Sequence, residues 1–310
     1  MKNQVLVLLA SMMFGAAVQA GSSDLDKALR LAAADNKAAG VDKALKAGAD
    51  VNSVGRYGIT SLVMAIENGN IAMVATLLNH GADVNRVSDT GTTAITAAAE
   101  YGHVHLLAML LERGADLHVR TRAGWNSLMI AADQGMVQMV DQLIFKGVDT
   151  ENADRKGRTA LMMAAQKGYV DVIGLLLGKG KSDPDARDNT GATALMLAVD
   201  AGRAECAAAL LAGGAAVNKA DKEGAAALHW AAANGDKKSV KLLLENKADI
   251  NKKSSEGGTA LMEAVQAGLP DMVRLLVVNG ADVAIKDASG LTAKDYAKKS
   301  SDKSLLSVLK

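Results

Sequence analysis

The sequence predicts an all-α fold in which pairs of short helices stack along a repeat of 33 residues. Three observations lead to this prediction. Glycines recur at a fixed spacing, the segments between them carry apolar residues at helical spacing, and the chain is 49% hydrophobic but only 3% aromatic. A core made of Ala, Leu, Val, Ile and Met favours close packing of helices over a large sandwich or barrel.

Two series of glycines mark the repeat. The first begins at Gly58 and continues at intervals of 33 residues, apart from one interval of 34. The second begins eleven residues later, at Gly69, and keeps the same rhythm. Two breaks in each unit predict two short helices in each unit. The first series comprises Gly58, Gly91, Gly124, Gly157, Gly191, Gly224, Gly257 and Gly290, and the second Gly69, Gly102, Gly135, Gly168, Gly202, Gly235 and Gly268.

The residues between the glycines place the helices. In residues 159–167, Leu161 and Ala164 recur at helical spacing, and Thr159 precedes them as an amino-terminal cap. Residues 170–177 are richly apolar, so the second helix of each pair is expected to be the more buried one. A glycine such as Gly180 is expected to end that helix in the left-handed conformation. Equivalent caps are expected at Thr60, Thr93, Thr193, Thr259 and Thr292, and equivalent ends at Gly81, Gly114, Gly147 and Gly280.

Each second segment is followed by GADVN or a close variant, for example at residues 48–52 and 81–85. Together with segments such as TALML and TALME, this motif makes the chain resemble ankyrin-repeat proteins. The resemblance implies a solenoid of stacked helix-turn-helix units with β-turn fingers. About seven full repeats would occupy residues 53–286, between degenerate caps at 24–52 and 287–310. The last cap is expected to lack its second helix, where the chain reads KKSSDKSLLSVLK, because a terminal unit must expose one side.

Two departures from the family pattern carry expectations of their own. The histidine that the family has in its first helix is retained only at His229, so its inter-repeat hydrogen bonds are expected to be missing in most units. One extra residue within 181–187 is expected to bulge a finger. Methionine replaces the histidine at Met129, Met162, Met196 and Met262.

The first twenty residues have the pattern of a secretory signal peptide. Lys2 precedes an apolar run from Val5 to Val18, and Val18 and Ala20 supply the small residues before a cleavage site. The alternative is an uncleaved membrane anchor, but the run is shorter than the roughly 20 residues that an anchor needs. We therefore expect a periplasmic protein, a single domain over residues 21–310, that is not inserted in the membrane and is a monomer when free.

Charge and cysteine content argue against two further classes. The chain has 35 basic and 34 acidic residues, and removal of Lys2 with the signal peptide leaves 34 of each. A neutral chain gives no reason to expect nucleic-acid binding, which depends on clustered positive charge. Cys206 is the only cysteine, so no internal disulfide can form, and its apolar surroundings indicate a core residue.

No motif predicts catalysis, a cofactor or a metal site. The run GKS at 180–182 resembles the end of a phosphate loop, but Leu175 stands where that loop needs glycine. The run also follows a helix, whose carboxyl end repels anions. The five histidines lack the convergent spacing of metal ligands, and Asp183 and Asp185 are interpreted as solvated loop charges. We expect a binding protein; a site hidden between the fingers is the one enzyme alternative left open.

The resemblance implies which residues contact a partner, because ankyrin proteins bind through residues beside the turn glycine and at the end of the first helix. Trp, Tyr and Arg dominate protein-protein hot spots, so Trp125 is the leading candidate. The alternative is that its ring lies on a neighbouring finger, and Trp230 is interpreted as a packing residue. The predicted binding residues are Arg56, Tyr57, Tyr101, Arg120, Arg122, Trp125, Arg155, Lys156, Arg158, Lys167 and Arg187, with Glu67, Asn68, Asp89, Thr90, Glu100, Gln134, Gln166, Asn189 and Asp200 beside them.

The export signal and the Ala-Leu-Met units are similar to those of exported bacterial ankyrin proteins that act as immunity or self-protection factors. This similarity implies a partner protein in the periplasm, with a peptidoglycan hydrolase (endopeptidase) as the leading candidate, inhibited by steric occlusion. Two alternatives remain open at this point. The chain would instead support an oxidative-stress enzyme such as catalase, or act as an envelope scaffold.

Overall fold

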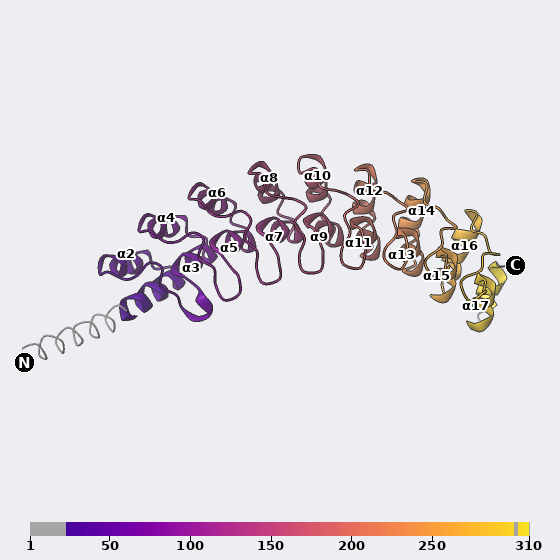
Figure 1. Ribbon diagram of the computed structural model, residues 1–310, viewed down its shortest axis with the longest axis horizontal. Coiled ribbons are helices and arrows are strands. Elements are labelled where there is room, and N and C mark those ends of the chain that lie inside the picture. The colour runs from indigo at the N-terminus through magenta and orange to yellow at the C-terminus, as the bar shows by residue number, and fades with distance from the viewer. Residues whose placement is uncertain (1–22, 301–302, 310) are drawn as a thin grey trace, which may run out of the picture. The chain divides into compact units, whose positions relative to one another are not determined.

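The computed structural model describes residues 23–300 and 303–309, and within them the chain is built from paired helices joined by turns (Figure 1). The expected signal peptide lies outside the described residues. No β-strand occurs in these described ranges, but three isolated antiparallel bridges close the bases of fingers, at Val54 and Thr60, Ala153 and Thr159, and Ala220 and Ala226. The predicted all-α architecture with turn fingers is confirmed.

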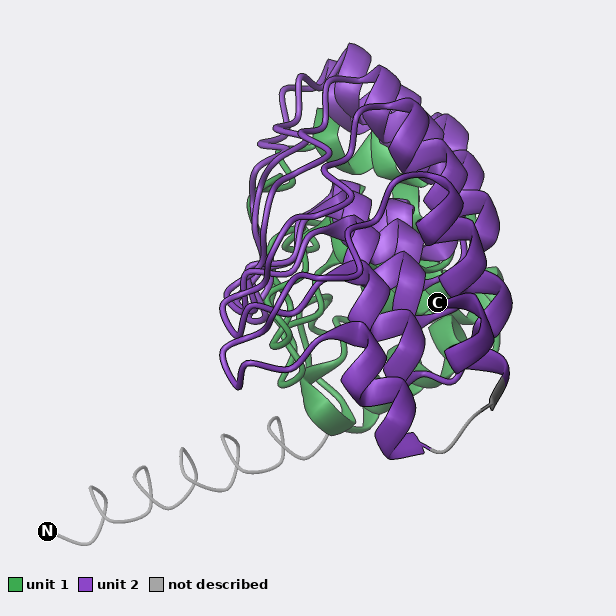
Figure 2. Ribbon diagram, turned by 90° about the vertical axis from the view of Figure 1, so that its right-hand side faces the viewer, with its two compact units in different colours: residues 1–130 green, residues 131–310 purple. Residues whose placement is uncertain are grey.

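The chain divides into two compact units, residues 1–130 and 131–310, with the boundary inside α7 (Ser127–Asp133) (Figure 2). In unit 1, α2 and α6 each contact α4, while α3 contacts α5, so second helices and first helices form separate rows. The single domain expected over residues 21–310 stays a prediction. The elements of unit 1 are a helix over 23–34, α2 (Ala38–Lys46), the 3-10 turn η1 (Arg56–Gly58), α3 (Ser61–Glu67), α4 (Ile71–Asn79), α5 (Ala94–Glu100) and α6 (Val104–Glu112).

Unit 2 repeats the same arrangement. Its first helices contact one another in order, α9 to α11, α11 to α13, α13 to α15 and α15 to α17, and each packs on the second helix of its own pair. The elements are α8 (Val137–Phe145), α9 (Ala160–Lys167), α10 (Val170–Gly178), α11 (Ala194–Asp200), α12 (Ala204–Ala212), α13 (Ala227–Ala233), α14 (Lys237–Glu245), α15 (Ala260–Gln266), α16 (Pro270–Val278), α17 (Ala293–Ser300) and α18 (Lys303–Val308).

In the full repeats the first helix of each pair is the more buried one, so the expectation from hydrophobicity was wrong. In α9 every residue from Ala160 to Ala165 is buried, whereas α10 buries only Val172, Ile173 and Leu176. Alanine-rich helices can approach their neighbours closely and become enclosed, while second helices keep one side in solvent despite their larger side chains. Phe145, at the end of α8, is 84% exposed.

The amino-terminal caps follow the prediction. The hydroxyl groups of Thr60, Thr159, Thr193 and Thr259 each accept a hydrogen bond from the backbone N–H three residues later. In the sixth repeat Ala226 has no hydroxyl group, and the contact runs in the opposite direction: Nδ1 of His229, three residues later, accepts the backbone N–H of Ala226 at 3.1 Å. Nε2 of His229 lies 3.3 Å from the carbonyl oxygen of Gly258 in the next repeat. The inter-repeat hydrogen bond expected at His229 is therefore present.

Of the glycines expected to end second helices in the left-handed conformation, Gly81, Gly114, Gly147 and Gly280 have positive φ, but Gly180 does not. The left-handed residue is Lys181, with φ 53°, and Ser182 donates its N–H to the carbonyl of Leu176. The extra residue therefore widens the end of α10 and does not bulge the finger, which was the expectation. The finger that follows is held by the side chain of Asp188, whereas a helix end can absorb one residue by moving its left-handed turn.

The last cap retains a short second helix, which corrects the expectation that it is lost. Helix α18 contacts α16 and α17, and Leu305 and Leu309 are buried. Leu305 is in α18 and Leu309 directly follows it, with the N–H of Leu309 donating to the carbonyl of Leu305, so the two side chains lie on the same side of the chain. Polar residues beside them, such as Ser304 and Ser307, are exposed to solvent, as expected of a terminal repeat.

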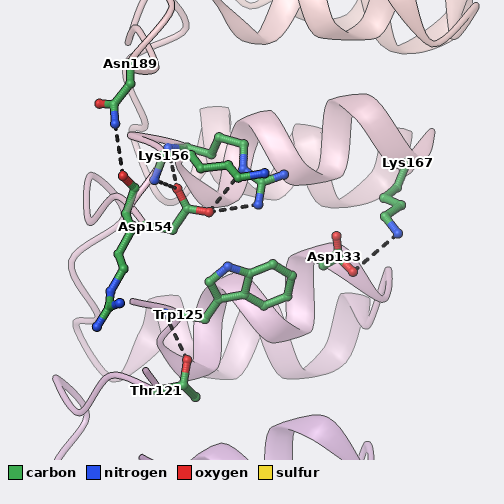
Figure 3. A network of polar contacts seen from close by, with 9 residues as sticks. Thr121, Trp125, Asp133, Asp154, Lys156, Lys167 and Asn189 are labelled. Atoms are coloured by element: carbon green, nitrogen blue, oxygen red, sulfur yellow. Dashed lines mark hydrogen bonds and ion pairs between the residues drawn. The ribbon is translucent and has the colours of Figure 1, made fainter. Parts of the chain in front are cut away.

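Each finger has five residues, and the fourth is the turn glycine. In the finger 154–158, the carboxylate of Asp154 accepts the N–H groups of Lys156 and Arg158 at 2.8 and 2.9 Å. Its Oδ2 also accepts Nε and Nη2 of Arg158 at 3.1 and 2.9 Å (Figure 3). Burial acts to raise the pKa of the Asp154 carboxyl, but these hydrogen bonds outweigh it and lower the pKa. The first finger residues are Gly55, Ser88, Thr121, Asp154, Asp188, Asp221, Ser254 and Asp287, and the fifth are Ile59, Thr92, Trp125, Arg158, Ala192, Ala225, Gly258 and Leu291.

Adjacent fingers within a unit are joined by a backbone hydrogen bond. The N–H of Asn189 donates to the carbonyl of Lys156 at 2.9 Å, and the N–H of Asp89 does the same to Tyr57 in unit 1. The GADVN loops add a second connection: Asn85 accepts the N–H of Asp116 and donates to the carbonyl of Gly114. Position and spacing of the fingers are thus fixed by backbone contacts, independently of the side chains that they present.

We predict that Gly157→Ala destabilises the protein more than Gly147→Ala. Both glycines have positive φ, which costs an alanine about 1 kcal/mol. A Cβ at Gly157 would also lie 2.7 Å from the backbone N of Asn189, whereas Gly147 has open space around it. Urea unfolding should therefore show an additional loss of about 2 kcal/mol for Gly157→Ala. Equal losses in the two variants would contradict a role for glycine in joining fingers.

We predict that Asp154→Ala lowers the free energy of unfolding by about 2–3 kcal/mol at neutral pH, because it leaves the guanidinium of Arg158 and two N–H groups without their acceptor. The Asp154 side chain is only 2% exposed. Since the folded-state pKa of this carboxyl is lowered, its contribution is present above the ordinary value of 3.8 and is lost as pH falls through the folded-state pKa. Asp171→Ala, at an exposed helix position, is the control. A deficit that persists undiminished in strong acid would be inconsistent with this reasoning.

Candidate functional site

We define the finger face, separately in each unit, as the finger residues around the turn glycines together with the carboxyl ends of the first helices. In unit 1 its most exposed aromatic side chain is that of Tyr57, which is 56% exposed. The guanidinium carbon of Arg56 lies 4.8 Å from the centre of the Tyr57 ring. Two of the predicted binding residues therefore form one cation-π pair at a finger tip.

The backbone of Tyr57 is strained. Its φ is 61°, a left-handed conformation that costs a residue with a Cβ about 1 kcal/mol or more. The cause lies in the sequence of this finger, because Gly55 stands where other fingers have Asp, Ser or Thr and has no side chain to accept backbone N–H groups. The finger turns through Tyr57 and Gly58 instead, and the carbonyl of Tyr57 still accepts the N–H of Asp89.

Carboxylates from two successive repeats lie together beside Tyr101. Burial raises the pKa of Glu67, and the charge of Glu100 adds to the shift. Burial likewise raises the pKa of Tyr101, with further contributions from Glu67 and Glu100. The Tyr101 ring also stacks on His103, with centroids 6.3 Å apart and planes inclined by 9°. This part of the finger face therefore presents an aromatic pair in a negative field, which favours a cationic group on a partner.

The other predicted residues of unit 1 differ in their exposure and in the hydrogen bonds that they form within the chain. The side chain of Trp125 is half-buried, and the backbone N–H of Trp125 donates to Thr121 Oγ1 at 3.2 Å (Figure 3). Arg120 and Arg122 are exposed. The side chain of Asn68 donates to the carbonyls at the end of the helix over 23–34, which gives it a structural role. Asp89 and Thr90 are exposed at the second finger.

In unit 2, several predicted cations are engaged within the chain. Arg158 is held by Asp154 and is 24% exposed. Arg187 donates Nε to the carbonyl of Gly191 at 3.1 Å and Nη2 to the carbonyl of Ala220. Lys167 lies 3.5 Å from Asp133 (Figure 3). The exposed residues of this set are Gln134, Arg155, Lys156, Asn189 and Asp200, and Gln166 is half-buried.

The structure adds a feature that sequence reasoning missed. A pocket of about 270 Å³ opens on the finger face of unit 2 beside Trp230, whose Nε1 donates to Asp221 Oδ2 at 3.1 Å. The sequence alone indicates a packing role for Trp230, and the predicted binding residues end at Asp200 in the fifth repeat. The acidic finger around Glu223 and the small Ala225 were the signals in the sequence that could have found it.

The described residues contain no group of three or more side chains that could hold a metal ion. None of the helices described is long and apolar enough to cross a membrane. The GKS run at 180–182 follows the end of α10, and Ser182 is buried there with its backbone N–H donating to the carbonyl of Leu176. Cys206 is buried, and burial raises the pKa of its thiol, as expected for a core residue.

Comparison with known proteins agrees with this architecture. A family model described as ankyrin repeats (3 copies) matches residues 29–121, 128–221 and 213–287. No curated protein matches the chain. The matched segments contain the paired helices, the turn glycines and the GADVN loops described above. The chain therefore belongs to the ankyrin-repeat family.

Proposed function

We propose that this chain is an exported module that binds a partner protein through its finger face and blocks the surface it covers. Ankyrin repeats indicate a protein-protein interaction module, and the single observation that supports this site is the exposed, strained Tyr57 paired with Arg56. The partner is a periplasmic enzyme, with a peptidoglycan hydrolase as the first candidate. Inhibition would be steric: the fingers would cover the surface at which the partner enzyme binds its substrate, and the partner enzyme alone would carry catalytic residues.

The left-handed backbone of Tyr57 costs free energy at a residue whose ring is exposed to solvent. Tyr57 holds a conformation that glycine or asparagine adopts more easily, yet its ring is exposed, with the guanidinium of Arg56 over its face. Tyrosine and arginine are the residues that contribute most to binding when a partner covers them. The finger carrying them is tied to the next one through Asp89, so little ordering is needed on association.

The cellular location rests on the first twenty residues. Their single lysine, apolar run and small residues before Gly21 are the features of a cleavable export signal. The preference for a cell-wall hydrolase rests on the similarity of this signal and the Ala-Leu-Met units to exported ankyrin proteins of the self-protection type.

We predict that the protein recovered from a bacterial periplasmic fraction begins at Gly21. Intact-mass measurement of the purified protein should show the loss of residues 1–20. Ala20→Leu, which places a large residue next to the cleavage site, should retain the precursor mass because the peptidase needs a small side chain there. Recovery of the full-length chain in the cytosolic fraction would refute export.

We predict that Tyr57→Asn abolishes capture and inhibition of the partner while leaving the protein at least as stable as the wild type. Asparagine tolerates left-handed φ, so about 1 kcal/mol of strain is relieved as the aromatic contact is lost. The measurements are capture of purified periplasmic peptidoglycan endopeptidases, inhibition of their hydrolysis of cell-wall fragments, and thermal unfolding. Phe145→Asn, which removes an exposed aromatic ring at the end of a second helix, is the matched control and should bind normally. Undiminished inhibition by Tyr57→Asn would remove this finger from the proposed site.

A further inference from the structure

The pocket beside Trp230 has a strongly one-sided charge. Four carboxylate residues line it, from α11, from the finger 221–225 and from α15, and its lining in this described part of the chain includes no lysine or arginine. The whole mature chain is neutral, so this concentration of negative charge is local. The carboxylate residues are Asp200, Asp221, Glu223 and Glu263.

The hollow exists because small residues stand where other repeats have large ones. Ala225, which lines the pocket, is the fifth finger residue, the position of Trp125 and Arg158 in the third and fourth repeats. The fingers on either side also have small fifth residues, Ala192 and Gly258. The pocket is therefore a gap left by missing side chains in an otherwise regular scaffold.

The fourth repeat shows what the finger carboxylate binds when the fifth finger residue is an arginine. There the finger carboxylate of Asp154 holds the guanidinium of Arg158 with two hydrogen bonds. Asp221 is the equivalent carboxylate, and its Oδ1 accepts the N–H groups of Glu223 and Ala225 just as Oδ1 of Asp154 accepts those of its own finger. The sixth finger thus reproduces the turn of the fourth, but Ala225 supplies no guanidinium. Oδ2 of Asp221, the equivalent of the oxygen that holds Arg158, accepts Nε1 of Trp230 and has capacity for one further donor.

An aromatic wall completes the pocket. Trp230 is half-buried, and its bond to Asp221 fixes the orientation of the indole ring. His229 is 3% exposed, and both of its ring nitrogens are engaged by backbone groups of Ala226 and Gly258, so it forms a fixed part of the lining. The face of an indole ring attracts a guanidinium group, and fixed neighbouring carboxylates strengthen that attraction.

We propose that this pocket receives an arginine side chain of the protein partner. That the arginine belongs to a protein follows from the proposed function, and this is the one point at which the inference rests on it. Arginine fits better than lysine, because a planar guanidinium stacks on indole and forms paired hydrogen bonds with carboxylates, whereas an ammonium group acts as a point charge. The contact uses a different unit of the chain from Tyr57 and would add to affinity and orientation.

The test is a titration of the purified full chain carrying Trp125→Phe, which leaves Trp230 as its only tryptophan. N-acetyl-arginine amide should change the Trp230 fluorescence saturably, with a dissociation constant in the millimolar range for so small a probe. The uncharged analogue N-acetyl-citrulline amide should give no saturable change, and N-acetyl-lysine amide should bind at least about 3-fold more weakly. Equal responses to the arginine and citrulline probes would overturn the proposal.

Substitutions in the pocket test whether the fluorescence change of Trp230 reports binding there. Glu263→Gln should weaken binding of the arginine probe about 5-fold, whereas Glu256→Gln, which removes the same charge from an exposed position on the next finger, should leave it unchanged. Ala225→Arg should abolish probe binding, because the new side chain would pair with Asp221 as Arg158 pairs with Asp154. Equal affinities in the two glutamine variants would exclude the pocket, even if Ala225→Arg fails to fold.

The titration does not need the partner, so its outcome is separate from that of the proposed function. A saturable arginine signal together with failed capture of periplasmic hydrolases would leave the pocket standing and refute the proposed partner. Capture that depends on Tyr57, without an arginine signal at Trp230, would refute the pocket alone.

Discussion

The structure depends on the absence of a side chain at the turn glycine of each finger. At Gly157 a Cβ would lie 2.7 Å from the backbone N of Asn189, and at Gly224 it would lie 2.5 Å from that of Ser255. Both residues also have positive φ. A Cβ atom at these two positions is therefore unfavourable for two reasons: the left-handed backbone of the turn, and the close approach of the next finger. Because the next finger comes so close, its N–H can reach the carbonyl of the preceding one, and the spacing of the fingers within each unit follows.

Much of the fold could be predicted from the sequence because these constraints recur at fixed intervals. Turn glycines, threonine caps and GADVN loops each report a local backbone requirement, and thirty-three residues separate successive occurrences. The errors arose where a property depends on neighbours instead. Burial of the alanine-rich α9 depends on how closely other helices approach it. The left-handed turn at Lys181 depends on whether the end of α10 or the following finger takes up the extra residue. Neither is encoded in hydrophobicity or in residue type alone.

The finger face was less predictable than the fold, for a related reason. Position in the repeat correctly located exposed groups such as Tyr57 and Arg122, but it could not show which cations the chain itself would engage. Arg158 and Arg187 occupy the expected positions, yet both are bonded to groups of their own or the next finger. The strain at Tyr57 follows from Gly55 two residues earlier, a substitution whose consequence appears only once the missing hydrogen bonds are traced.

The fifth finger residue shows how such a scaffold can acquire specificity. The backbone of the fifth residue is held in the same way in repeats four and six, by the first finger residue, whether its side chain is that of Arg158 or of Ala225. Its side chain is therefore free to vary at little cost to the fold. A large residue fills the space between the finger and the first helix from within, whereas a small one leaves the finger carboxylate and the helix aromatic group open to another molecule. The same turn then holds an arginine of its own chain in the fourth repeat and lines a pocket in the sixth, where Ala225 replaces the arginine and Trp230 adds an aromatic wall.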